Sequence, residues 1–249
     1  RYMMRDRDID YTFIGALEDI CYLYNIRGWD VESTPVVLSY ALVSRDQAYL
    51  FIDKEKVTSE VKGPLEEAGV RIYDYDAVEN YLREIEGQKV VYLDPNRTNI
   101  YLYDQLNNNV KIQTGINLTS YMKAIKTDIE IENTKEAHIK DGVAVTKFFR
   151  WIETGARTSY VSEASAAEKL HEFRQNQEDF LQDSFAAIVG YGSNGAIVHY
   201  NPLTVPRSAR VESRGLLLVD SGGQYLQGTT DVTRTYAMGE TTYEEKLDY

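Results

Sequence analysis

The chain has 249 residues, which is enough for one or two domains. Hydrophobic residues make up 43% of it and charged residues 27%, values typical of a globular protein rather than a disordered or fibrous one. Acidic residues outnumber basic ones by 39 to 27, and the net charge of -12 argues against nucleic acid as a partner. No apolar run approaches the ~20 residues that cross a bilayer, so we expect no membrane span.

Residues 1–125 alternate short apolar runs with mixed polar segments. Runs rich in β-branched and aromatic residues predict strands at 11–14, 36–43, 48–52 and 89–93. Two segments between them, 18–24 and 76–85, carry apolar residues at helical spacing. Strands that alternate with helices predict an α/β layer domain over residues 1–125.

Residues 126–249 follow a different pattern, which predicts a second domain. After a charged connection at 123–132, Asn133 with Glu136 indicates a helix start, Gly155 a helix end and Ser162 the cap of a second helix. Beyond Asp183, apolar runs separated by glycine-rich turns predict strands at 185–189, 196–200, 216–220 and 229–237. We expect two helices followed by a β-rich unit.

The stretch from Gly190 to Gly195 matches the GxGxxG pattern of dinucleotide-binding proteins. That function needs a helix immediately afterwards, because the helix N-terminus holds the pyrophosphate. The residues that follow, 196–200, are strand-like and end before Pro202. We therefore interpret the glycines as a turn between strands.

Two aspartates stand in an almost uncharged stretch, since residues 215–239 contain only Asp220, Asp231 and Arg234 as charged residues. A hairpin centred on Tyr225–Leu226 would place the aspartates opposite each other, with Cβ atoms about 4.5–5.5 Å apart. Like charges destabilise such a pair, and a divalent cation would offset that cost. Alternatively, either carboxylate pairs with Arg234 or caps a turn.

His199 and Cys21 are the other candidates for chemistry. His199 stands at the end of an apolar run, where it could present its imidazole to a cleft as a donor or proton carrier, or could be structural. Cys21 is the only cysteine, which excludes an internal disulfide and suits a reducing, cytoplasmic compartment. Its helical, apolar neighbours favour a buried structural thiol.

Residues 220–235, DSGGQYLQGTTDVTRT, resemble aminopeptidase P, the Xaa-Pro branch of the pita-bread metallopeptidases. Residues 194–200 and 137–141 resemble the same family. The first half is similar to the middle, creatinase N-terminal-like domain of its three-domain members through residues 18–20, 25–28 and 35–41. The resemblance implies a fold in which an α/β domain is followed by the first half of an α+β pita-bread catalytic domain.

The resemblance also implies roles for individual residues. Asp220 would be a bidentate ligand of one metal ion, Asp231 would bridge two ions, and His199 would contact substrate and help move protons. Two divalent ions, usually Mn²⁺, would activate water against the peptide bond that precedes proline. The substrates would be peptides with proline in the second position, and the family often forms homodimers.

This chain departs from the family pattern in three places. Members supply a further histidine and two glutamates as ligands after the second aspartate, and this chain has no histidine after Asp231. Gln227 stands where many members have an aspartate that is not a ligand. The first of three domains is not visible, and residues 241–249 resemble an interrupted helix. We therefore expect a piece of a longer protein that binds metal weakly and is inactive by itself.

Two other functions remain open for the parent protein. Prolidase shares the spacing of the two aspartates and would act on Xaa-Pro dipeptides. A non-catalytic pita-bread module that binds peptides or proteins would also fit a chain that lacks three of five ligands. The residues that follow Tyr249 would decide between enzyme and binding module.

Overall fold

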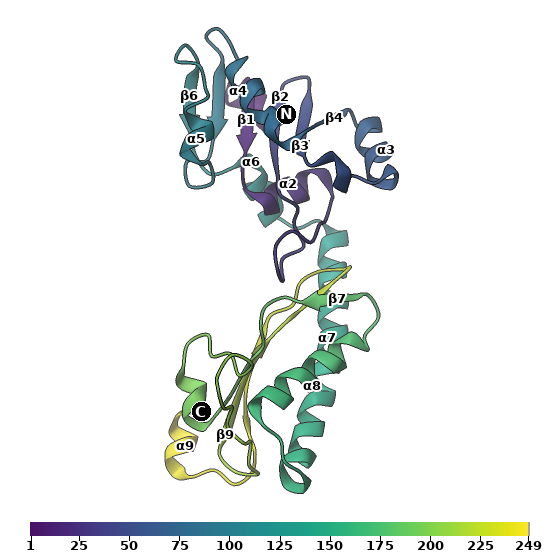
Figure 1. Ribbon diagram of the computed structural model, residues 1–249, viewed down its shortest axis with the longest axis vertical. Coiled ribbons are helices and arrows are strands. Elements are labelled where there is room, and N and C mark those ends of the chain that lie inside the picture. Colours follow the sequence, from purple (N-terminus) through teal and green to yellow (C-terminus); the bar gives the residue numbers. More distant parts are fainter. Residues whose placement is uncertain (249) are drawn as a thin grey trace. The chain divides into compact units, whose positions relative to one another are not determined.

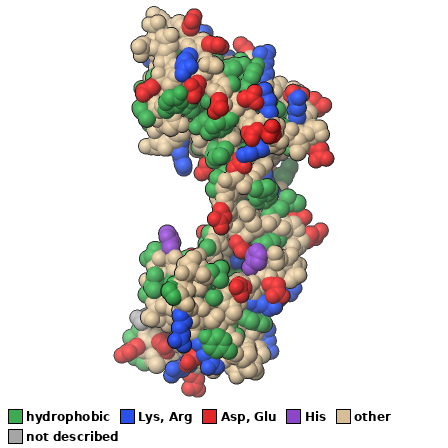
Figure 2. Space-filling view, in the orientation of Figure 1, with side chains coloured by type: hydrophobic (Ala, Val, Ile, Leu, Met, Phe, Trp, Pro, Cys, Tyr) green, Lys and Arg blue, Asp and Glu red, His purple; other side chains and the backbone are tan. Residues whose placement is uncertain are grey.

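The computed structural model describes residues 1–248, which form two compact units (Figure 1). Unit 1 covers Arg1–Lys126 and unit 2 begins at Thr127, close to the division expected from the sequence. On the face shown in Figure 2, acidic and basic side chains are interspersed over both units. Within the described residues, no helix combines the length and apolar character needed to span a membrane.

A six-stranded mixed sheet forms the centre of unit 1, in the order β4-β3-β2-β1-β5-β6. Its strands are β1 (Tyr11–Ile14), β2 (Ser39–Ser44), β3 (Ala48–Ile52), β4 (Val70–Tyr73), β5 (Val90–Leu93) and β6 (Lys111–Thr114). The helical segments are α1 (Tyr2–Asp6), α2 (Leu17–Tyr24), η1 (Lys54–Lys56), α3 (Ser59–Glu67), η2 (Tyr75–Ala77), α4 (Val78–Arg83), α5 (Ile100–Tyr103) and α6 (Leu118–Ala124).

Both faces of this sheet are covered by apolar clusters. Successive side chains of each strand point to opposite faces, so neighbouring residues enter different clusters. Phe13 of β1 packs in one apolar cluster with Leu82 of α4. The next residue, Ile14, packs in a second cluster with Ile20 of α2. The predicted α/β layer arrangement of the first half is confirmed.

Two helices lead unit 2, and the predicted ends of the first one are wrong. Helix α7 (Asp128–Thr158) begins before Asn133, because the Thr127 side chain accepts a hydrogen bond from the Glu130 N–H while Glu130 binds back to the Thr127 N–H. It also continues through Gly155, where a Cβ would come within 3.2 Å of Val161. Helix α8 (Glu163–Gln175) begins after Ser162, which caps it as predicted.

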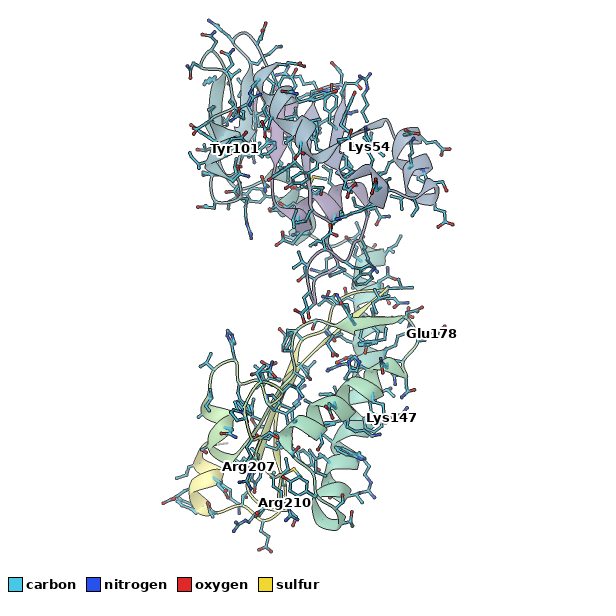
Figure 3. The ribbon with its side chains drawn as sticks, in the orientation of Figure 1. Lys54, Tyr101, Lys147, Glu178, Arg207 and Arg210 are labelled. Atoms are coloured by element: carbon cyan, nitrogen blue, oxygen red, sulfur yellow. The ribbon has the colours of Figure 1, made fainter. Side chains whose placement is uncertain are left out.

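The rest of unit 2 is β-rich, as expected, and its main sheet has the order β11-β9-β8. Helices α7 and α8 lie against one face of this sheet (Figure 1), and exposed residues such as Lys147 lie on the outer side of α7 (Figure 3). The remaining elements are β7 (Phe180–Asp183), β8 (Ile188–Tyr191), η3 (Gly192–Ala196), β9 (Leu216–Ser221), β10 (Gly223–Tyr225), β11 (Val232–Ala237) and α9 (Tyr243–Asp248). Strands β7 and β10 pair separately.

Two of the predicted strands are corrected. The run expected at 185–189 begins at Ile188 and ends at Tyr191. The strand expected at 196–200 does not form; instead, the 3-10 helix η3 is followed by a bend at residue 197 and a turn at 198–199. The β-branched residues Ile197 and Val198 are 51% and 83% exposed. Their side chains therefore do not pack against a neighbouring strand, which is the contact that favours β-branched residues in sheets.

Candidate active site

Asp220 lies in β9 and Asp231 directly precedes β11, and these two strands pair at a register that differs from the expected one. Asp220 lies opposite Thr233 rather than opposite Asp231. The hairpin closes between Leu226 and Gln227, where Tyr225 and Gly228 exchange backbone hydrogen bonds of 2.8 and 3.2 Å. The turn centre therefore lies one residue later than predicted, which shifts every partner by two positions.

A shift of two positions keeps side chains on the same face, because strand side chains alternate with a period of two. Asp231 directly precedes β11, and it becomes a diagonal neighbour of Asp220 rather than its direct partner. Diagonal neighbours have Cα atoms about 7–8 Å apart. The two carboxylates still lie on one side of the sheet, and both line the same cavity.

This cavity has a volume of about 470 Å³ and brings all three predicted site residues together. His199, Asp220 and Asp231 contribute polar groups, and Asn201 adds an amide. The lining is completed by an apolar wall of Phe185, Ala186 and Ile188. The cavity lies on the face of the sheet opposite the helices, because the alternate β9 residues Leu217 and Val219 pack in the helix-covered core.

The surroundings of Asp220 fit a metal ligand. Its Oδ1 atom is buried and has no hydrogen-bond partner among the described residues. Leaving a buried polar atom without a hydrogen bond lowers the stability by about 1–3 kcal/mol. A partner from outside the described residues, such as a cation, would remove that penalty. Carboxylate oxygens are the ligands that hard divalent cations prefer.

The alternative ion pair with Arg234 is not formed within residues 1–248. Arg234 lines a different cavity, beside α7, and donates to the Thr233 carbonyl oxygen at 2.7 Å. Across the described residues, no group of three His, Cys, Asp or Glu side chains is placed to hold an ion. The two aspartates therefore fit part of a metal centre that needs further ligands.

His199 reaches the cavity from a turn, not from the strand that we predicted. His199 has a left-handed backbone conformation, with φ of 55°, and is exposed. The glycines of the GxGxxG stretch serve this turn, because a Cβ at Gly190 would come within 2.8 Å of the Gly195 backbone. They allow η3 to fold back on β8, which agrees with the interpretation of this motif as a turn.

Sequence reasoning missed Asn201 and the apolar wall of the cavity. Asn201 follows His199 by two residues, and its Oδ1 accepts from the Leu203 N–H at 2.9 Å. Its position before Pro202 signalled only a turn. Phe185 and Ala186 lie between β7 and β8, in a segment that we had assigned to a strand.

Two family models account for almost the whole chain. Residues 1–130 match the Creatinase/Prolidase N-terminal domain, and residues 132–249 match Metallopeptidase family M24. The chain belongs to the family of proteins with a Creatinase/Prolidase N-terminal domain, which is followed here by part of a domain of Metallopeptidase family M24. The predicted fold, an α/β domain followed by part of a pita-bread domain, is therefore confirmed.

Named relatives agree with the resemblance to aminopeptidase P. Xaa-Pro aminopeptidase 1 from Dictyostelium discoideum is 39% identical over 251 residues, and aminopeptidase P2 from Arabidopsis thaliana is 34% identical over 277 residues. These matches cover 98% and 99% of this chain but only 39% of each relative. The chain thus spans about two fifths of the length of these relatives.

A solved structure supports the same relationship. The X-prolyl aminopeptidase from Caenorhabditis elegans, described as a cytosolic enzyme with a di-nuclear active site, matches with a TM-score of 0.90 and 28% identity. The match covers 98% of this chain and 40% of the worm protein.

Proposed function

We propose that the protein containing this chain is a metallo-aminopeptidase that removes the N-terminal residue ahead of proline. The observation that carries the proposal is the unpaired, buried oxygen of Asp220 beside Asp231 in a cavity that also holds His199. The names of the relatives and the di-nuclear site described for the worm enzyme support it.

All the cavity residues except Asn201 have a proposed task. Asp220 and Asp231 would hold two divalent ions, Mn²⁺ by resemblance, together with ligands from outside this chain. When bound, such ions lower the pKa of water and polarise the amide carbonyl. His199 would bind the substrate by hydrogen bonding and pass a proton at its imidazole nitrogens. The apolar wall of Phe185, Ala186 and Ile188 suits the ring of a proline.

The location and assembly of the protein belong to the same proposal. We expect a cytoplasmic enzyme, because Cys21 is a buried free thiol and the similar worm protein is described as cytosolic. The homodimer implied by the resemblance stays a prediction, which light scattering of the full-length protein would test.

Peptide cleavage by the full-length protein tests the proposed activity. We expect release of the first residue from Xaa-Pro-Yaa tripeptides with Mn²⁺ present, and little release from matched Xaa-Ala-Yaa peptides. Cleavage of Xaa-Pro dipeptides alone would favour prolidase instead. No cleavage of either, with peptide binding retained, would favour a non-catalytic module.

The isolated chain of residues 1–249 supplies the matched control for that assay. It contains both aspartates and His199 but no later histidine, so we expect no measurable hydrolysis under the same conditions. Hydrolysis by this material would show that the ligand set of the family is not needed.

A further inference from the structure

A buried acid in unit 2 lies outside the cavity and is not explained by the proposed chemistry. Glu163 is the first residue of α8 and is 0% exposed. Within residues 1–248, no lysine or arginine forms an ion pair with it. Burying a carboxylate without a cation costs free energy unless hydrogen bonds and dipoles replace the lost water. The donors around Glu163 therefore indicate what this residue does.

Among the described residues, the donors that bind the Glu163 carboxylate come from residues 191–209. Its Oε1 accepts from the Tyr191 N–H at 2.7 Å and from Asn194 Nδ2 at 2.9 Å. Its Oε2 accepts from the Tyr200 hydroxyl at 2.6 Å and from the Ala209 N–H at 2.8 Å. A single carboxylate thus binds the beginning, middle and end of the segment that carries His199.

The middle contact lies next to the candidate catalytic histidine. Tyr200 is 6% exposed, whereas His199 is exposed and has the left-handed φ of 55°. A left-handed backbone at a residue other than glycine is unfavourable and persists only where the surroundings fix it. The hydrogen bond from the Tyr200 hydroxyl to Glu163 holds the side chain of the residue directly after His199.

We propose that Glu163 is a positioning residue that holds residues 191–209 so that His199 faces the cavity with Asp220 and Asp231. This inference rests on the proposed function, because it assigns Glu163 a role through His199. Glu163 does not line the cavity and therefore acts through Tyr200 and Asn194.

The chemistry of the node explains why a carboxylate is needed there. Four donor groups converge on the two oxygens, and a glutamine would turn its own NH₂ group toward at least one N–H. Burial, followed by the hydrogen bond to Glu163, raises the pKa of Tyr200 to about 12, so its hydroxyl stays a donor at neutral pH.

Glu163→Gln and Tyr200→Phe in the full-length protein test this proposal. We expect Glu163→Gln to lower kcat/KM by about 10- to 100-fold, mostly in kcat, because a small displacement of a catalytic group has that cost. Tyr200→Phe removes one contact and should cause a smaller loss in the same direction. Asp19→Asn is the matched control, since Asp19 is a buried carboxylate of unit 1 with three side-chain partners. It should lower stability but leave kcat/KM unchanged at temperatures well below unfolding.

Combining Glu163→Gln with His199→Ala separates an effect on the position of His199 from general destabilisation. In the His199→Ala background, adding Glu163→Gln should cause little further loss of kcat/KM, because the group it positions is gone. A full additional loss in this background, or unchanged kcat/KM in both single variants, would overturn the proposal.

Hydrogen–deuterium exchange supplies a readout that does not need activity. Glu163→Gln should speed exchange of the amides in residues 191–201 and leave those of β9 protected. If wild-type protein cleaves no Xaa-Pro peptide, the proposed function fails, while the exchange data still decide whether Glu163 anchors this segment. Unchanged exchange in Glu163→Gln would refute the anchor even in an active enzyme.

Discussion

Asp141 and Arg174 form an ion pair in the core of unit 2, where each side chain is 1% exposed. Arg174 binds the two carboxylate oxygens through Nε at 2.7 Å and Nη2 at 3.2 Å. The Tyr225 hydroxyl donates to Asp141 at 3.0 Å, and burial, together with this carboxylate, raises the pKa of Tyr225. The group therefore links α7 and α8 to the hairpin that carries both aspartates.

Asp141→Asn should lower the free energy of unfolding by about 3–5 kcal/mol, because it leaves the Arg174 guanidinium buried without a counter-charge. Urea unfolding measures this change. Lys135→Ala is the control, since Lys135 and Glu132 form a pair with side chains 62% and 71% exposed. It should change stability by less than about 1 kcal/mol. Equal effects of the two variants would contradict the importance given to the buried pair.

The three polar residues His199, Asp220 and Asp231 could be predicted from the sequence, whereas their register and the other lining residues of the cavity could not. Any two-residue turn centred between two residues puts Asp220 and Asp231 on one face, because moving such a centre by one residue shifts the register by two positions. The turn follows Tyr225, which ends β10 and donates a hydrogen bond from its hydroxyl to Asp141. That contact joins residues 84 positions apart, so no local pattern reveals it.

At the scale of single elements, the start of α7 shows how two capping signals compete. Thr127–Glu130 and Asn133–Glu136 have the same spacing, and the helix start was predicted at the second pair. The helix uses the first, and Asn133 lies in its interior. The charged segment 123–132 has no apolar periodicity and was therefore predicted to be a connection. Its three isoleucines, Ile125, Ile129 and Ile131, are exposed, so the helix has no buried face here that a periodic pattern could reveal.

Thr127→Ala should therefore cost about 1 kcal/mol, the usual effect of removing an N-cap hydroxyl. Asn133→Ala should be neutral or slightly stabilising, because alanine is the better residue inside a helix. Thermal unfolding of the two variants compares them directly. A larger loss from Asn133→Ala than from Thr127→Ala would restore the helix start that the sequence suggested.

The segment 196–200 failed as a predicted strand for a reason outside its own residues. Its composition, Ala-Ile-Val-His-Tyr, favours a strand. Hydrogen bonds from Asn194 and Tyr200 to Glu163 instead hold it in a turn. Glu163 is more than thirty positions away in sequence, so no local pattern in residues 196–200 reveals its contact with them.

Over the whole molecule, several carboxylates have a pKa below the ordinary value of 3.8. Burial alone would raise the pKa of Asp19, yet hydrogen bonds from Ser120 and Lys123 outweigh it. Hydrogen bonds from Lys140 and Gln227 lower the pKa of Asp179, and Lys56 does the same for Asp30. Each of these groups is a stronger acid in the folded chain than in the unfolded chain.

Their contribution to stability is complete above about pH 5 and is lost as the pH falls through the lowered folded values. We expect the free energy of unfolding to decrease as the pH falls below about 5. Urea unfolding at a series of pH values measures it, and Asp19→Asn should flatten the curve. A stability that rises with acidification would contradict the assigned directions.

The central claim is that Asp220 and Asp231 hold metal ions on one face of the β9–β11 sheet. The most direct test is the metal content of the full-length protein after dialysis, by plasma mass spectrometry, with Asp220→Asn, Asp231→Asn and the control Asp179→Asn. We predict that both site variants lose bound Mn²⁺ while the control keeps the wild-type content. Retention of the full metal content in both site variants would contradict the account.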